Sequence, residues 1–193
     1  MSGALLGAFV GLPFGVVASA LAWWIVFHGF RPKLEWTDAI EAVPRAELPL
    51  AVEHAVAFRN VGRRAAVDVH THARLRIKGL IPDRPSRWVV IEIPTNNLVI
   101  PRVDPFRKAK RKHILVLLPS GARDADLRRL PDQVGDRVRD GTVGLAELMS
   151  LGSDADVTLS AICSDEFSGA RHPYLSQRLT LDNIASDDKT LEQ

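Results

Sequence analysis

The chain divides into two regions that differ in how apolar and polar residues follow one another. From Gly3 to Phe30 there is no Asp, Glu, Lys or Arg, and His28 is the only ionisable side chain. After Phe30, charged residues are frequent, and apolar residues recur at alternate positions. A continuous apolar run predicts a membrane-spanning helix, whereas alternation predicts strands with one buried face. We expect a transmembrane anchor over residues 1–33, a β-sandwich soluble domain over 34–184 and a polar C-terminal tail over 185–193.

The apolar run is long enough to cross a lipid bilayer once. Its 28 residues would measure about 42 Å as a helix, against a hydrocarbon core of about 30 Å. Trp23 and Trp24 lie near its C-terminal end, where aromatic rings settle at the membrane interface, and Arg31 and Lys33 follow. Since basic residues favour the cytoplasmic side, we expect a plasma-membrane protein with an outside N-terminus and a cytoplasmic domain.

A cleaved signal peptide is the competing interpretation of the same run. The tripeptide Ala18-Ser19-Ala20 imitates the small-residue pattern of a cleavage site. However, no basic residue precedes the run, and it continues as apolar sequence to Phe27 beyond the supposed cut. We therefore favour an uncleaved anchor.

Small residues recur every fourth position within the run. On a helix this spacing forms a groove along one face, into which another helix can pack closely. The alternative is that membrane helices simply tolerate glycine. The pattern predicts a contact with a membrane protein partner or a second copy of the chain, through the residues Gly3, Gly7, Gly11, Gly15 and Ser19.

The composition of the remaining chain restricts its partners. The formal net charge of +2 is close to neutral, so we expect no general nucleic-acid binding. The single cysteine, Cys163, excludes a disulfide within the chain and fits a reducing compartment. The excess of Arg over Lys is typical of a GC-rich bacterial source.

Alternating apolar residues predict the strands of the soluble domain. A first strand has Leu48, Leu50, Val52, Val56 and Phe58 on one face, and an Asn60-Val61-Gly62 turn follows it. In a second strand, Val67, Val69, Ala73, Leu75 and Ile77 point inward and Asp68, His70, His72, Arg74, Arg76 and Lys78 point outward. Further strands are expected over 88–93, 112–118, 156–164 and 174–181, and short helices over 124–130 and from a Thr142 cap to Gly152. Prolines between these segments, including Pro101, are expected to end strands. The fold class is mainly β, an antiparallel sandwich with one or two short helices.

The stretch from Phe58 to Val69, FRNVGRRAAVDV, resembles the strand–turn–strand of immunoglobulin-like bacterial sandwich modules, including cell-adhesion-related domains. The resemblance covers about 25 residues around an Asn-x-Gly turn, and it implies a binding or spacer module without catalysis. It departs from that family in one respect. Such modules are usually exported, whereas the charges here favour a cytoplasmic domain.

The strongest metal-like cluster is Asp68, His70 and His72. Residues two apart on a strand face the same side, so these three could converge on one ion. No fourth ligand follows from the sequence, and Arg74 and Arg76 on the same face would repel a cation. We therefore interpret the row as a solvated sheet face and keep a membrane-tethered metal-dependent enzyme as the alternative.

The strongest charged feature is a run of basic residues before a predicted strand. It could hold anionic lipid headgroups close to the anchor, or an acidic protein partner. Binding to nucleic-acid phosphates would normally involve interleaved aromatic residues, of which only Phe106 is present. The remaining alternative is a solvated loop whose lysines protect a sheet edge. The run comprises Arg107, Lys108, Lys110, Arg111 and Lys112.

Together these patterns predict a membrane-anchored binding or scaffold module, an accessory or sensor subunit of a membrane protein assembly. The sequence has no nucleophile elbow, phosphate-binding glycine loop, dinucleotide fingerprint or zinc-protease motif, so we expect no enzyme and no cofactor. A self-associating structural homo-oligomer is the third alternative.

Overall fold

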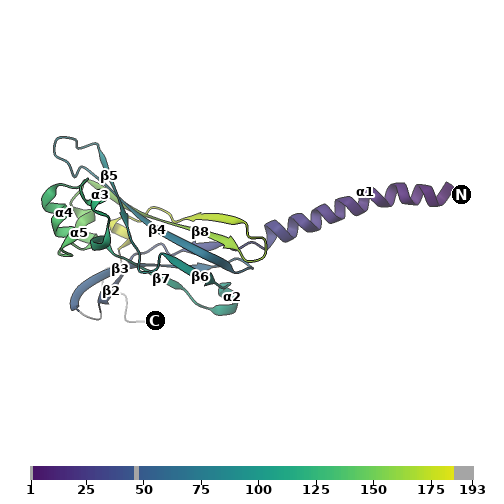
Figure 1. Ribbon diagram of the computed structural model, residues 1–193, viewed down its shortest axis with the longest axis horizontal. Helices are drawn as coiled ribbons and strands as arrows, with labels where there is room; N and C mark the ends of the chain where they lie inside the picture. The colour runs from purple at the N-terminus through teal and green to yellow at the C-terminus, as the bar shows by residue number, and fades with distance from the viewer. Residues whose placement is uncertain (1, 46–47, 185–193) are drawn as a thin grey trace.

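The computed structural model describes residues 2–45 and 48–184, and within them the side chains of 13–26, 29–43 and 53–184. A long helix projects from one end of a domain made of two antiparallel sheets (Figure 1). The mainly β fold with a few short helices is therefore confirmed. The strands are β1 (Leu34–Trp36), β2 (Glu41–Arg45), β3 (Leu48–Asn60), β4 (Ala66–Lys78), β5 (Trp88–Ile93), β6 (Val99–Val103), β7 (His113–Leu117), β8 (Asp154–Asp165) and β9 (Arg171–Leu175).

Each sheet is organised around one long strand. In the first sheet β3 is central, with β1 and β2 following one another along one edge and β7 on the other. In the second sheet β4 is central, with β5 and β6 along one edge, β8 on the other and β9 beyond β8. The chain passes from the first sheet to the second through the predicted turn after Asn60.

The two sheets enclose a single hydrophobic core, as expected for a sandwich. Phe58 and Leu115 from the first sheet and Leu75 and Leu159 from the second are fully buried members of one cluster. The alternation in β4 is confirmed from Val69 onward, because every second side chain is buried as far as Ile77. The residues predicted on the first half of β3, namely Leu48, Leu50 and Val52, lie outside the described side chains.

The predicted inward position of Val67 is wrong because β4 contains a bulge. Asp68 adopts a left-handed conformation with φ of 50°, and the pairing with β8 shifts register between Val67 and His70. An extra residue in one strand reverses which side chains face the core on its two sides. Ala66 is therefore fully buried, whereas Val67 is only partly buried.

Two further strand predictions need correction. Pro101 lies inside β6, which among the described strands pairs with β4 alone, and an edge strand tolerates a residue without an N–H group. The strand predicted over 174–181 is instead β9, Arg171–Leu175. Its ladder ends where the Ser176 hydroxyl accepts the N–H of Leu159 at 2.9 Å, in place of a backbone carbonyl.

Short helices close the end of the sandwich opposite the long helix (Figure 1). Thr142 does not cap the helix predicted after it, because its hydroxyl donates to the carbonyl of Arg137 at 3.0 Å at the end of α4. The helix α4, Asp132–Arg139, was not predicted, although a proline, Pro131, immediately precedes its first residue and prolines are frequent at helix starts. The helices of the domain are α2 (Phe106–Ala109), α3 (Asp124–Leu127), α4 (Asp132–Arg139) and α5 (Leu145–Ser150), with 3₁₀ turns at Pro119–Gly121 and Leu181–Asn183.

The projecting helix α1 extends over Ser2–Trp24 and continues into a π-helical turn, Ile25–Gly29. Every side chain from Pro13 to Ile25 is exposed. In the part of the chain that the structure describes, no helix meets the length and hydropathy needed to span a membrane. The predicted tail over 185–193 lies outside the described residues.

Candidate functional site at the helix–domain junction

The turn after β3 attaches the segment that follows α1 to the domain. Asn60 is fully buried, and its Oδ1 accepts the backbone N–H groups of Lys33 at 3.1 Å and Gly62 at 3.0 Å. Its Nδ2 donates to the carbonyl oxygens of Arg64 at 2.7 Å and Val103 at 3.1 Å. One amide therefore joins the start of β1, the turn itself and the end of β6.

Gly62 allows this segment to approach the turn closely. A Cβ atom at Gly62 would lie 2.4 Å from the backbone nitrogen of Lys33 and 2.6 Å from the carbonyl oxygen of Arg31. In the same region the Val61 N–H donates to the Lys33 carbonyl at 2.8 Å. Glycine is therefore required here for space rather than for an unusual backbone angle.

Arg64 connects the π-helical turn to the hairpin formed by β8 and β9 in the second sheet. Its Nη2 donates to the carbonyl of Val26 at 2.9 Å, and its Nη1 lies 3.5 Å from Asp165 Oδ1. The guanidinium carbon lies 4.5 Å from the ring centre of Phe167 and 5.9 Å from that of Phe30, within the range of cation–π attraction. A single side chain thus contacts both sides of the junction.

Asp165, which is buried, and Tyr174, which is partly buried, complete these attachments. Burial raises the pKa of Asp165, but hydrogen bonds from Ser168 and the Phe167 N–H, together with Arg64, outweigh it, so the net pKa lies below its ordinary value. The Tyr174 hydroxyl donates to the carbonyl of Pro32. Burial raises the pKa of Tyr174 to about 12, with a further contribution from Cys163, so this hydroxyl remains a donor at neutral pH.

The predicted interface residues lie beside this junction. Trp23 and Trp24 are 59% and 58% exposed, and the side chains of Arg31 and Lys33 are exposed on either side of buried Pro32. On the predicted packing face of α1, Ser19 is exposed, and a Cβ built at Gly15 would meet no described atom within 4 Å beyond its chain neighbours and the backbone of its own helix. Gly3, Gly7 and Gly11 lie outside the described side chains.

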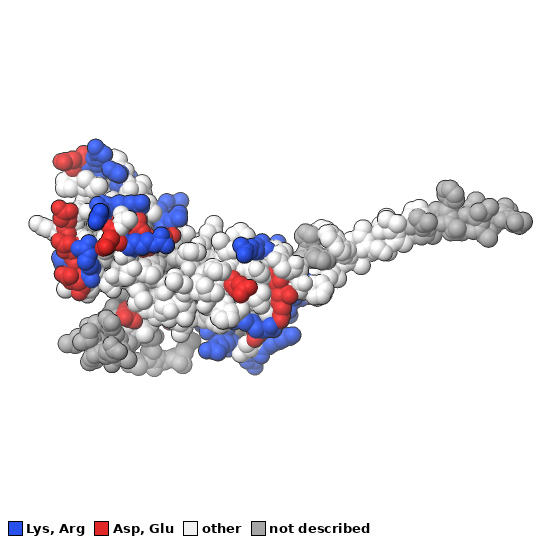
Figure 2. All heavy atoms as spheres, viewed as in Figure 1, with Lys and Arg blue, Asp and Glu red and all other residues white. Residues whose placement is uncertain are grey.

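The predicted basic run occupies α2 and the loop after it. Arg107, Lys108, Lys110, Arg111 and Lys112 are all exposed, and among the described residues none forms an ion pair. Figure 1 places α2 at the end of the domain from which α1 departs, and Figure 2 shows basic side chains gathered there together with a few acidic ones. The structure thus brings the basic run and the C-terminal end of the apolar helix to the same end of the domain.

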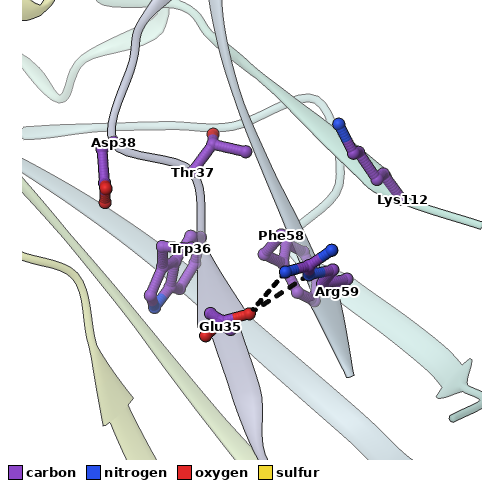
Figure 3. Close-up of a pocket in the computed structure, with 7 residues that line it drawn as sticks. All are labelled: Glu35, Trp36, Thr37, Asp38, Phe58, Arg59 and Lys112. Atoms are coloured by element: carbon purple, nitrogen blue, oxygen red, sulfur yellow. Dashed lines mark hydrogen bonds and ion pairs between the residues drawn. The ribbon is translucent and has the colours of Figure 1, made fainter. Parts of the chain in front are cut away.

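Lys112, at the end of the run, lines a hollow at the edge of the first sheet. The volume of this hollow is about 370 Å³, and Figure 3 shows the side chains that line it. Arg59 donates to Glu35 Oε2 through Nε at 3.2 Å and Nη2 at 2.9 Å, and it also lies 5.1 Å from the ring centre of Phe106. The lining residues are Glu35, Trp36, Thr37, Asp38, Phe58, Arg59 and Lys112.

Lys108 lines a second hollow, which we call the junction pocket because it lies beside the turn after β3. Its volume is about 410 Å³. Segments distant in the sequence meet there: the turn after β3, the end of β6 with the start of α2, and the loop after β8. The charged lining residues are Arg63, Arg64, Arg102, Asp104, Lys108 and Glu166.

The outer face of β4 carries the predicted metal-like cluster. Asp68, His70 and His72 are exposed and line a shallow cavity of about 310 Å³. Within the described residues, no three His, Cys, Asp or Glu side chains are grouped so as to hold a metal ion. Cys163 is 1% exposed, and burial, followed by the charge of Asp165, raises the pKa of its thiol to about 11, so it is a buried apolar residue as predicted.

No protein-family model matches the chain, and no curated protein sequence matches it either. Sequence reasoning recognised the Asn60 turn, but it assigned no role to Asn60, Arg64, Asp165 or Tyr174. The one available signal was the Asn-x-Gly pattern, which marks a turn without indicating what that turn holds.

Proposed function

We propose that the protein is a single-pass membrane-anchored binding or scaffold module. In this proposal α1 lies in the plasma membrane, the immunoglobulin-like sandwich is on the cytoplasmic side, and the whole acts as an accessory or sensor subunit of a membrane protein assembly. The observation that carries the proposal is the exposed apolar surface of α1, joined to the domain through a well-bonded junction.

The described part of α1 has apolar side chains around its whole circumference. The large ones are 54–74% exposed, which is costly in water but favourable in hydrocarbon. Residues 13–24 alone would measure about 18 Å, so a bilayer crossing also requires the apolar sequence that precedes them. The large exposed side chains are Phe14, Val16, Val17, Leu21, Trp23 and Trp24.

The junction supports a fixed relation between the helix and the domain. Asn60, Arg64 and Tyr174 each bond to backbone atoms of the segment 26–33. With that segment held, the basic run of α2 stays near the end of the helix, at the level where anionic headgroups would lie. This arrangement favours a membrane surface over nucleic acid as the partner of the basic run.

Membrane integration is tested with the full-length protein in cells. We expect it to remain with the membrane fraction after alkaline carbonate extraction, and a Val17→Arg, Leu21→Arg variant to be released. Ser2→Cys and Ser86→Cys variants, each in a Cys163→Ser background, then test orientation with a membrane-impermeant maleimide. Labelling of the first in intact cells, and of the second only after permeabilisation, is the expected result. Release of the wild-type protein by carbonate would sink the proposal.

Partner binding is tested by purification in a mild detergent with mass determination. We expect one stoichiometric membrane protein to co-elute and to be lost in a Gly7→Leu, Gly11→Leu variant. Ala4→Leu with Ala8→Leu, on a neighbouring helix face, is the matched control and should retain the partner. A defined homo-oligomer would instead support the self-association alternative. Unchanged assembly in both variants would show that the glycines are merely tolerated.

A further inference from the structure

The geometry points to the junction pocket as a binding site for the phosphate group of an anionic phospholipid. The lipid as source of that phosphate rests on the proposed function, whereas the phosphate chemistry rests on the pocket alone. The pocket has the volume of a small-molecule site, about 410 Å³. Two of its lining residues, Arg63 and Arg64, contact the segment that joins α1 to the domain.

The lining of the pocket is basic, with four cationic and two acidic side chains. Arg102 pairs with both acids: its Nε lies 2.8 Å from Asp104 Oδ1, and its Nη2 lies 3.2 Å from Glu166 Oε2. Arg64 is directed towards Asp165 and the Val26 carbonyl. Arg102, Asp104 and Glu166 together keep one negative charge, which the two remaining cations of the pocket, Arg63 and Lys108, outweigh.

Arg63 and Lys108 are the two cations of the pocket that have no carboxylate partner among the described residues. Both are exposed, and they come from different segments, the turn after β3 and α2. A guanidinium can bind two phosphate oxygens at once, and an ammonium group adds a point charge. Two unpaired cations bordering one pocket are therefore suited to a single phosphate group.

The position of Arg63 favours a lipid as the source of the phosphate. Its guanidinium carbon lies 5.1 Å from the ring centre of Phe30, the last residue of the apolar run. If the run spans the bilayer, Phe30 lies at its edge and Arg63 lies at headgroup level. A phospholipid could then place its phosphate in the pocket while its acyl chains remain beside α1.

Two other hollows fit this ligand less well. In the hollow of Figure 3, the charges of two basic and two acidic side chains cancel, and Arg59 is already bonded to Glu35. A larger hollow of about 600 Å³, bordered by Arg87 and Arg128, lies between β5 and the segment after α3, at the end of the sandwich away from α1. Of these three hollows, the junction pocket alone combines proximity to the helix with two cations that have no carboxylate partner among the described residues.

The test uses full-length protein in a neutral detergent and native mass spectrometry. The probes are dioleoyl phosphatidylglycerol, dioleoyl phosphatidylcholine and soluble glycerol 3-phosphate. We expect phosphatidylglycerol to bind in preference to phosphatidylcholine. Lys108→Glu and Arg63→Gln should each weaken that binding at least about fivefold, since one basic charge at a membrane surface has roughly that effect. Arg87→Glu is the matched control for charge and should bind like the wild type.

Each outcome decides the inference. Equal binding of the two lipids, equal weakening by Arg87→Glu, or unchanged binding in Lys108→Glu would overturn it. Because Arg63 also contacts Phe30, Lys108→Gln provides a second variant on a side chain without an assigned structural contact. If glycerol 3-phosphate binds and phosphatidylglycerol does not, the pocket is a phosphate site, but a phospholipid is not the source of the phosphate. Failure of the membrane proposal appears separately, as carbonate release of a protein whose pocket still binds glycerol 3-phosphate.

Discussion

Replacing Asn60 with alanine would remove four hydrogen bonds from the interior of the helix–domain junction. The side chain is fully buried, and its bonds reach two backbone groups of the turn itself and one each before β1 and at the end of β6. Alanine is shorter and apolar, so it offers no substitute partner to these N–H and carbonyl groups. The backbone groups of Lys33 and Gly62 lie nearer the surface than that of Val103, whose residue is 1% exposed.

The expected loss follows from the number of bonds. A typical intramolecular hydrogen bond contributes about 1 kcal/mol net, and a buried group left unpaired costs about 1–3 kcal/mol. We expect Asn60→Ala to lower the free energy of unfolding by about 3–4 kcal/mol, with water recovering part of the loss at Lys33. For a chain of this size that corresponds to a decrease in Tm of about 6–16 °C.

Asn96 provides the matched control. It is exposed, and its Oδ1 accepts one backbone N–H, from Val116 at 3.0 Å. Asn96→Ala should therefore cost about 1 kcal/mol or less. Urea unfolding of the full-length protein in mild detergent measures the free energy of unfolding of both variants, with buried Trp36 as one of the fluorescent reporters. If the two variants lose the same stability, Asn60 does not hold the junction, and the reasoning fails.

Three other substitutions or measurements test the domain. Because the pKa of Asp165 is lowered in the folded protein, its charge stabilises above the unfolded value of about 4 and this contribution disappears as pH falls through the folded pKa. The stability difference between wild type and Asp165→Asn should thus close at acidic pH, and a pH-independent difference would contradict the assignment. Arg76 forms a two-contact ion pair with Asp156, which is 4% exposed. Arg76→Met alone should therefore lower the free energy of unfolding by about 3 kcal/mol or more, because it leaves the Asp156 charge unpaired, whereas Arg76→Met with Asp156→Leu should lower it much less. Equal losses of the two variants in denaturant unfolding would show that the buried charge is not the cause. Cys163 should resist a thiol reagent at pH 8 until the protein is unfolded, and rapid labelling of the native protein would contradict its burial and its raised pKa.

Local patterns in the sequence predicted much of the secondary structure. The strand over 88–93 is found with the predicted bounds, and the inward residues of β4 from Val69 to Ile77 are correct. Strand periodicity is a local property, since successive side chains of an extended chain must point to opposite faces. It fails where a local exception occurs, as at the bulge of Asp68 or the edge proline Pro101.

For the candidate site too, features that depend on local sequence were predicted, and features that depend on distant contacts were not. The basic run and the interface tryptophans were identified from composition and spacing, and the structure adds that the basic run lies at the end of the domain from which α1 projects. Membrane insertion and the packing role of the glycine face remain predictions, because both depend on surroundings outside the chain. The metal-like spacing of His70 and His72 was correct as a shared strand face, but no third ligand accompanies it to form a metal-binding group in the described part of the chain.

What the sequence determined by itself is the division into an apolar helix and an alternating β domain, because each pattern depends on the geometry of a few consecutive residues. Only the tertiary structure decided that Arg64 bonds to Val26, that Tyr174 bonds to Pro32 and that Arg63 and Lys108 border one pocket. Those pairs are separated by up to 142 residues. Their meeting depends on which strands are neighbours and on the register between them, and neither follows from the period of a single strand.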